Sequence, residues 1–165
     1  MRILTICSLA PTVLAIFLTA SSAQAAVYHF ELQGLNTAVD SFGNVIAING
    51  QGNFDTTQPT VKASGTYTVY DSTGAVTSKG KWVATDFVSF APGGGVNNGF
   101  QTGLLRLSIT LRPKGGAPIP NVPMSVFCEP GEVPGPAEAD SGDGTTVGNF
   151  TINAHGFTLF QLILP

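Results

Sequence analysis

The chain has 165 residues, of which 43% are hydrophobic and only 10% charged, with a formal net charge of −3 at pH 7. This composition excludes a disordered chain, which would need more charge and fewer apolar side chains. Seven basic residues stand against ten acidic ones, so we predict no nucleic-acid partner, because such proteins usually carry a basic surplus.

The first 25 residues have the pattern of a cleaved signal peptide. Arg2 supplies a positive charge, residues 4–20 are almost wholly apolar, and Ala23 and Ala25 are the small residues that a signal peptidase reads. We therefore predict cleavage after Ala25 and an exported, periplasmic or extracellular protein. The apolar run is near the short limit for a transmembrane helix and no basic cluster follows it, so we predict no stable membrane span after cleavage.

Cleavage at this point changes the composition of the mature chain. It removes Arg2 and Cys7, which leaves ten acidic residues, six basic residues and Cys128 as the single cysteine. One cysteine cannot form an internal disulfide, so the exported chain must be held together by its core. We predict a single β domain over residues 26–165, a length that suits one domain.

Alternating apolar and polar residues, the period of a half-buried strand, recur along the mature chain. Gly or Pro interrupts nearly every window long enough for a helix. The alternating apolar positions are, in chain order, Tyr28, Phe30 and Leu32; Ile46 and Ile48; Tyr67 and Val69; Leu105, Leu107, Ile109 and Leu111; Val122, Met124, Val126 and Cys128; and Phe150, Ile152 and Ala154. Residues 157–164 are apolar on both parities, which predicts a strand covered on both faces.

Turn residues separate these strands. Residues 71–74, Asp-Ser-Thr-Gly, predict a type I turn that joins strands near 64–70 and 75–84 into a hairpin, and residues 41–44 predict a second hairpin tip. We expect loops at residues 92–95 and 113–120, and a long mobile loop at residues 129–146. About eight antiparallel strands result. That number closes a small barrel or forms a two-sheet sandwich, and we favour the barrel slightly.

The predicted hairpin also carries a resemblance. The run Gly65-Thr66-Tyr67-Thr68-Val69-Tyr70-Asp71-Ser72-Thr73-Gly74, followed by Val76, Ser78, Gly80 and Trp82, resembles a pattern in uncharacterised small secreted β-proteins of microbes. The resemblance implies a shared hairpin, and it implies no activity.

Three residues are candidate ligand contacts: Trp82, Asp86 and Arg106. Counting by twos along an unbroken strand places Asp86 on the face of Trp82, where burial would raise the pKa of its carboxyl group. A bulge at Thr85 would instead turn the carboxylate to water, and we favour this alternative because an unpaired buried charge is costly. Arg106 could bind an anion inside a barrel, although a solvated outer face is the simpler interpretation.

Two groups of residues could bind a metal. Glu138, Asp140 and Asp143 form an acidic, glycine-rich stretch that could bind calcium, although it lacks the full pattern of a calcium loop. His29 and Glu31 share the polar face of one strand, but a metal site needs further converging ligands. We favour a solvated loop and a solvent-facing pair, and we predict no cofactor.

The sequence predicts no catalytic residues. It has no Gly-x-Ser-x-Gly motif, and Cys128 lies on the inward parity of its strand as an inert buried thiol. We favour a non-catalytic protein that binds a small apolar or amphipathic ligand inside a barrel. The alternative is a cell-envelope or extracellular structural or interaction protein. An enzyme that uses Asp86, or His29 with Glu31, is the third possibility.

Overall fold

The computed structural model describes residues 26–97, 100–128 and 143–164. These residues form eight strands: β1 (Val27–Val39), β2 (Val45–Asp55), β3 (Thr60–Tyr70), β4 (Val76–Asn97), β5 (Phe100–Pro113), β6 (Ile119–Cys128), β7 (Gly144–Val147) and β8 (Ile152–Leu164). All of their pairings are antiparallel. The prediction of an all-β protein with about eight antiparallel strands is therefore confirmed. The predicted signal peptide, residues 1–25, lies outside the described residues.

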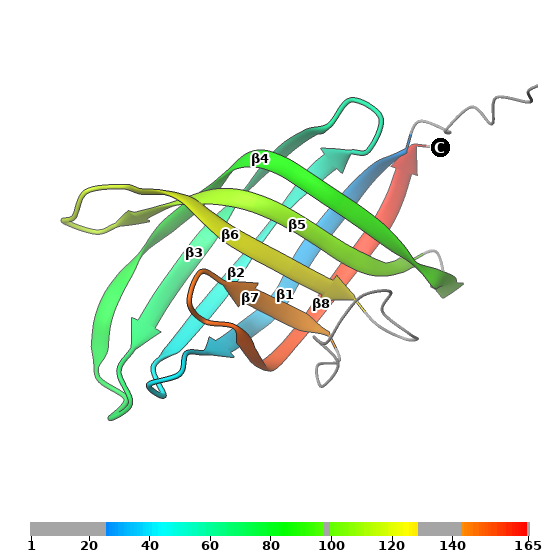
Figure 1. The fold of residues 1–165 in the computed structure, drawn as a ribbon. Helices are drawn as coiled ribbons and strands as arrows, with labels where there is room; N and C mark the ends of the chain where they lie inside the picture. Colours follow the sequence, from blue (N-terminus) through cyan, green and yellow to red (C-terminus); the bar gives the residue numbers. More distant parts are fainter. Residues whose placement is uncertain (1–25, 98–99, 129–142, 165) are drawn as a thin grey trace, which may run out of the picture.

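The eight strands belong to one hydrogen-bonded sheet rather than two. Their order is β4-β3-β2-β1-β8-β5-β6-β7, and β4 also pairs with β5. Backbone pairing therefore runs in a ring through six of the strands. Figure 1 shows β5, β6 and β7 crossing in front of β1, β2 and β8. The hydrophobic core lies on the inward face of this sheet, where most of the alternating apolar positions of the sequence gather. The inward parity predicted for Ile152 and Ala154 is wrong, because Ile152 is 58% exposed and Asn153, which pairs with buried Ala38, takes the inward face and hydrogen-bonds to Thr145.

Trp82 of β4 is the largest fully buried side chain. Its indole Nε1 donates a hydrogen bond to the backbone oxygen of Asn49 on β2, at 2.8 Å. A Cβ atom added at Gly50 or Gly65 would overlap the indole ring, so these two glycines provide the space that the ring occupies. This packing fixes which face of β4 points inward.

Aromatic rings fill much of the rest of the core. Phe54 lies at their centre, with ring centroids 4.9 Å from Phe90, 5.2 Å from Tyr28, 5.8 Å from Phe87 and 6.1 Å from Phe160. The other fully buried apolar side chains include Phe30, Ile46, Ile48, Leu105, Leu107, Ile109 and Met124. The protein's own side chains thus pack against one another on the inward face.

The prediction of a loop at residues 92–95 is wrong, because these residues belong to β4. β4 and β5 form a long hairpin whose pairing extends from Gly80 with Pro113 to Asn97 with Phe100. A Cβ atom added at Gly93 would overlap the Thr102 side chain on β5. Glycine therefore allows the two strands to approach closely where the sequence pattern suggested a break.

β8 is held to the sheet differently on its two edges. It pairs with β1 along nearly its whole length, but with β5 only at Gln161 and Phe100. Further along β8, the Thr158 hydroxyl donates a hydrogen bond to the backbone oxygen of Phe127 on β6. Side-chain hydrogen bonds therefore continue the connection where backbone pairing to β5 stops.

Side-chain hydrogen bonds also join β8 to β7. Asn153 Oδ1 accepts a hydrogen bond from the Thr145 backbone N–H at 3.3 Å, and Asn153 Nδ2 donates to the Asp143 backbone oxygen at 3.2 Å. Asn36 Nδ2 on β1 donates to the Phe157 backbone oxygen at 3.3 Å. Asn36, Thr145 and Thr158 are fully buried. The hydroxyl groups of Thr145 and Thr158 donate to the backbone oxygens of Ser125 and Phe127, whereas Asn36 Oδ1 has no partner among the described residues.

Two further expectations for the C-terminal third are corrected. Residues 157–164 are not covered on both faces, because Phe157, Leu162 and Ile163 are 50%, 44% and 46% exposed on β8. Only one face of β8 packs on the core. Within the long loop expected at residues 129–146, residues 144–147 form β7, which pairs with β6, and residues 129–142 lie outside the described residues.

Both predicted hairpin turns are confirmed. The Gly74 N–H donates to the Asp71 backbone oxygen at 2.9 Å in the β3–β4 turn, and the Gly43 N–H donates to the Asp40 backbone oxygen at 3.1 Å in the β1–β2 turn. Hydrogen bonds from the Thr73 hydroxyl and from backbone N–H groups lower the pKa of the Asp71 carboxyl group. Backbone N–H groups lower the pKa of Asp55 in the β2–β3 turn.

These lowered pKa values predict a loss of stability in acid. The contribution of a carboxylate with a lowered folded pKa is complete above its unfolded pKa, about 4, and disappears as pH falls through the folded value. We expect the free energy of unfolding in urea to fall below about pH 4. In a variant with Asp55→Asn and Asp71→Asn, the free energy of unfolding should decrease less in acid. An unchanged decrease would show that other carboxylates cause the loss of stability.

A Gly65→Ala variant tests the packing of Trp82. The added methyl group would overlap the indole Nε1 and the Asn49 backbone oxygen, so we expect the free energy of unfolding to decrease by roughly 2 kcal/mol. Gly116→Ala is the control, because a Cβ atom there meets only the Pro113 ring in an exposed turn. Urea denaturation followed by Trp82 fluorescence measures the stability of both variants. Equal stability would contradict the close packing of Trp82 against Gly65.

Candidate functional site

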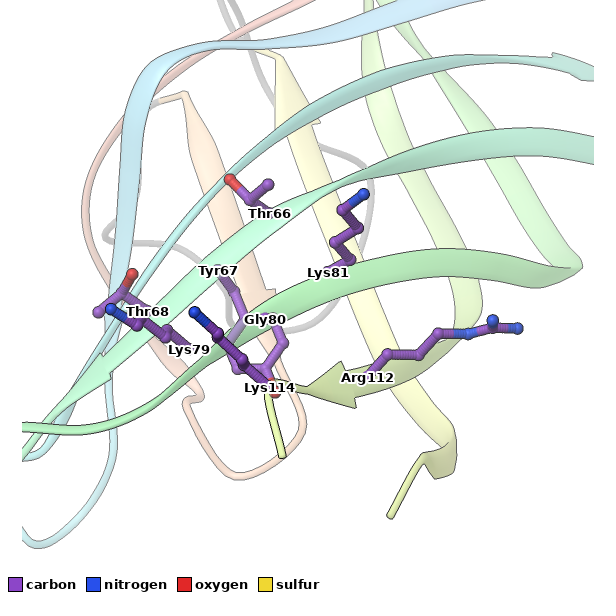
Figure 2. Close-up of a pocket in the computed structure, with 8 residues that line it drawn as sticks. All are labelled: Thr66, Tyr67, Thr68, Lys79, Gly80, Lys81, Arg112 and Lys114. Carbon is purple, nitrogen blue, oxygen red and sulfur yellow. The ribbon is translucent and has the colours of Figure 1, made fainter. Parts of the chain in front are cut away.

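A pocket of about 500 Å³ lies on β3, β4 and the end of β5, and we call it the basic pocket (Figure 2). Its lining residues are Thr66, Tyr67, Thr68, Lys79, Gly80, Lys81, Arg112 and Lys114. Four of these eight side chains carry a positive charge.

The strand register explains why these residues meet. Lys81 of β4 lies between Thr66 of β3 and Arg112 of β5. Lys79 lies opposite Thr68, and its backbone oxygen accepts a hydrogen bond from the Lys114 N–H at 2.8 Å. The cations therefore form two adjacent rows that cross the three strands.

Burial of Trp82 determines that these rows face solvent. Successive side chains of a strand point to opposite faces, so Lys81 and Lys79 point outward when Trp82 points inward. Gly80 lies between the two lysines, and a Cβ atom there would overlap the Arg112 backbone oxygen. Glycine at this position lets β5 approach β4 and brings the cations of the two strands together.

The cations of the basic pocket are not neutralised by any carboxylate of the described residues. In the part of the chain that the structure describes, no carboxylate forms an ion pair with Lys79, Lys81, Arg112 or Lys114. Four of the six basic residues after residue 25 thus gather at one place in a chain of net negative charge. Like charges directly opposite on neighbouring strands, such as Lys81 and Arg112, repel one another, so a bound anion would stabilise the arrangement.

The cationic side chains reach solvent from different directions. In Figure 2 the side chains of Lys79 and Lys114 extend to the same side, whereas Arg112 extends away from them. The pocket is therefore open and can contact more than one anionic group. It suits a partner with several separated negative charges better than a single enclosed ion.

The lining of the basic pocket consists of cationic and hydroxyl-bearing side chains together with Gly80. It contains no His, Asp, Glu or Cys that could transfer a proton or attack a substrate near neutral pH. Tyr67 is only 3% exposed, and its buried hydroxyl group has no hydrogen-bond partner. The Thr66 hydroxyl donates to Asn49 Oδ1 at 2.7 Å.

A second pocket of about 700 Å³, which we call the polar pocket, lies on β1, β2, β3 and β4. It is lined by His29, Gln51, Gly52, Asn53, Val61, Lys62, Ala63, Ser64, Val83 and Ala84. His29 Nδ1 and Asn53 Oδ1 are 2.7 Å apart and share a hydrogen bond. Lys62 is the single basic residue of this pocket.

The structure does not bring the three predicted ligand contacts together. Trp82 is fully buried in the core. The register of β4 shifts between Ala84 and Asp86, so Asp86 lies opposite Ser108 and is exposed. This irregularity is the bulge that the sequence analysis favoured, and it turns the Asp86 carboxylate to water.

Arg106 is half-buried on the outward face of β5. It pairs with Ser89 of β4 and Ser125 of β6, and it lines neither the basic pocket nor the polar pocket. The anion site that the sequence analysis considered inside a barrel therefore has no support from the position of Arg106.

The candidate metal ligands also remain separate. Glu138 and Asp140 lie outside the described residues, while Asp143 lies beside β7. His29 is hydrogen-bonded to Asn53, on the face that Glu31 shares. Among the residues that are described, no group of three or more His, Cys, Asp or Glu side chains could hold a metal ion. The described segments also contain no helix with the length and apolarity needed to cross a bilayer.

Sequence reasoning missed the basic pocket. The available signal was the spacing of two residues between Lys79 and Lys81 and between Arg112 and Lys114, which places each pair on one face of its strand. The spacing does not show that the two lysines lie beside Arg112 and Lys114. Only the pairing of β4 with β5 brings these four residues together.

Comparisons of the chain with protein-family models, with curated proteins and with solved structures found no match. The candidate function therefore depends on the site geometry described above. The resemblance of the hairpin to small secreted β-proteins stays a prediction.

Cys128 is a buried thiol, as the sequence predicted. Burial, together with the charge of Asp143, raises the pKa of Cys128 to about 11. Because only the thiolate reacts, we expect no labelling of the folded chain from residue 26 onward by a thiol reagent at pH 7, and complete labelling in urea. Rapid labelling of the folded protein would contradict the buried position.

Proposed function

We propose that the protein is an exported, non-catalytic binding protein whose basic pocket holds anionic groups of a larger partner. The observation that carries this proposal is the gathering of four cations, which form no ion pair with a carboxylate of the described residues, at one surface pocket of a net acidic chain. The signal-peptide pattern supports export. In this proposal the ring of six paired strands acts as a small barrel that supports the pocket from within.

The packing of the core favours an outer site over an interior one. Interior positions that would contact a small apolar ligand carry large side chains, such as Trp82 and Phe54, that are already packed. One observation favours the apolar ligand as a second candidate. Tyr28, Phe87 and Phe90 are only partly buried, so their rings offer apolar surface beside the core.

Dextran sulfate and uncharged dextran have the same polymer backbone and differ in their sulfate groups. Comparing the binding of the two polymers therefore tests whether the protein recognises anionic groups. We expect the protein to bind only the sulfated polymer, with an affinity that falls as salt screens the charges. Replacing Lys79 and Lys114 by Gln removes two exposed charge contacts and should weaken binding about tenfold. Lys79→Arg with Lys114→Arg preserves the charge and should keep most of the affinity.

Two outcomes would overturn the proposal. Arg106→Gln removes a charge outside the pocket, so a loss per charge as large as for the pocket lysines would show that net charge, not the pocket, drives binding. Absence of binding to dextran sulfate, together with an apolar molecule retained by the native protein in mass spectrometry, would instead support the second candidate.

A further inference from the structure

We infer that the partner is an acidic polysaccharide, and that one extended chain lies across both the basic pocket and the polar pocket. This inference rests on the proposed function, since it names the class of partner and the surface that it covers. It is carried by the continuity of the two pockets and by the kinds of side chain that line them.

The register makes the two pockets one surface. Ser64 and Thr66 are two residues apart on β3 and therefore point to the same face. Ser64 pairs with Gln51 and Val83 in the polar pocket, while Thr66 pairs with Lys81 in the basic pocket. From Lys62 to Thr68 the surface follows β3 for about 20 Å. A surface of this length suits an extended chain better than one small anion.

Neutral hydrogen-bonding groups separate the charges along this surface. Gln51, Asn53 and Ser64 provide amide and hydroxyl groups of the kind that bind sugar hydroxyls, with Lys62 at one end and the cations of the basic pocket at the other. Glu31 pairs with Gln51 on β2 and is the acidic side chain nearest to these rows in the register. Neutral groups with positive charges at both ends, and Glu31 at one edge, complement a chain that carries both hydroxyl groups and carboxylates or sulfates.

The same lining argues against a single-stranded nucleic acid. Binding of such strands depends on exposed aromatic rings that stack on the bases. The aromatic rings that line the two pockets are those of Tyr67, which is buried, and His29, whose Nδ1 shares a hydrogen bond with Asn53. The strongly exposed Phe42 and Phe157 belong to the β1–β2 turn and to β8, outside both pockets. One imidazole cannot stack on a succession of bases, so this surface is poorly suited to a single strand.

The test uses the chain from residue 26 onward and galacturonate oligosaccharides of increasing length, which carry one carboxylate per sugar. Titration calorimetry should show at least about tenfold tighter binding of the octasaccharide than of the disaccharide, because the longer chain reaches both pockets. A variant with Gln51→Ala and Lys62→Gln should lose this gain and keep the affinity for the disaccharide. Lys62→Arg is the matched control, and Trp82 fluorescence reports that each variant is folded.

The outcomes separate this inference from the proposed function. Equal affinity for both lengths, or a gain that survives the Gln51 and Lys62 changes, would overturn the inference. Binding of galacturonates that is weakened by the Lys79 and Lys114 changes but not by the Gln51 and Lys62 changes would overturn the inference and leave the proposed function intact. Binding to neither galacturonates nor dextran sulfate would overturn both. Tighter binding of an oligothymidylate of equal charge would replace the polysaccharide by a nucleic acid.

Discussion

The burial of Trp82 is the constraint on which the site depends. Because side chains alternate along a strand, an indole that must point inward forces Lys79 and Lys81 to point outward. A shift of one residue in the register of β4 would bury both lysines and expose the indole. The hydrogen bond to Asn49 and the space above Gly50 and Gly65 exclude that shift. Core packing thus determines the chemistry of the outer surface.

Closure of the sheet depends on side-chain hydrogen bonds rather than on core packing. Backbone pairing between β8 and β5 is reduced to one residue pair. Buried Thr158 and half-buried Asn153 continue the connection to β6 and β7 through side-chain hydrogen bonds. Burying a polar group without a hydrogen bond is costly, so these bonds favour this one arrangement of the strands as well as stabilising it. The basic pocket lies toward the other end of β5, around Arg112, where β4 pairs with both β3 and β5.

The positive charges of the basic pocket attract anions only over a short distance. The chain has a net negative charge, yet its cations gather on β4 and β5. At physiological ionic strength, charges are screened over about 8 Å, so an anionic partner in the basic pocket is affected mainly by the cations there. Such a surface attracts anions only at close range. That property suits selective contact with an extended polymer more than long-range steering of small ions.

Local patterns in the sequence determined most of the strands, both hairpin turns and most inward positions, because alternation and turn chemistry act over a few residues. They placed Ile152 inward wrongly, since the bonds of Asn153 to β7 turn that strand the other way. They also indicated the bulge beside Asp86, since an unpaired buried carboxylate is unfavourable. Tertiary structure decided that residues 92–95 extend β4, that residues 144–147 pair as β7, and that Lys79 and Lys81 lie beside Arg112 and Lys114. Which strands become neighbours depends on how the whole chain buries its apolar face, and no local pattern contains that information.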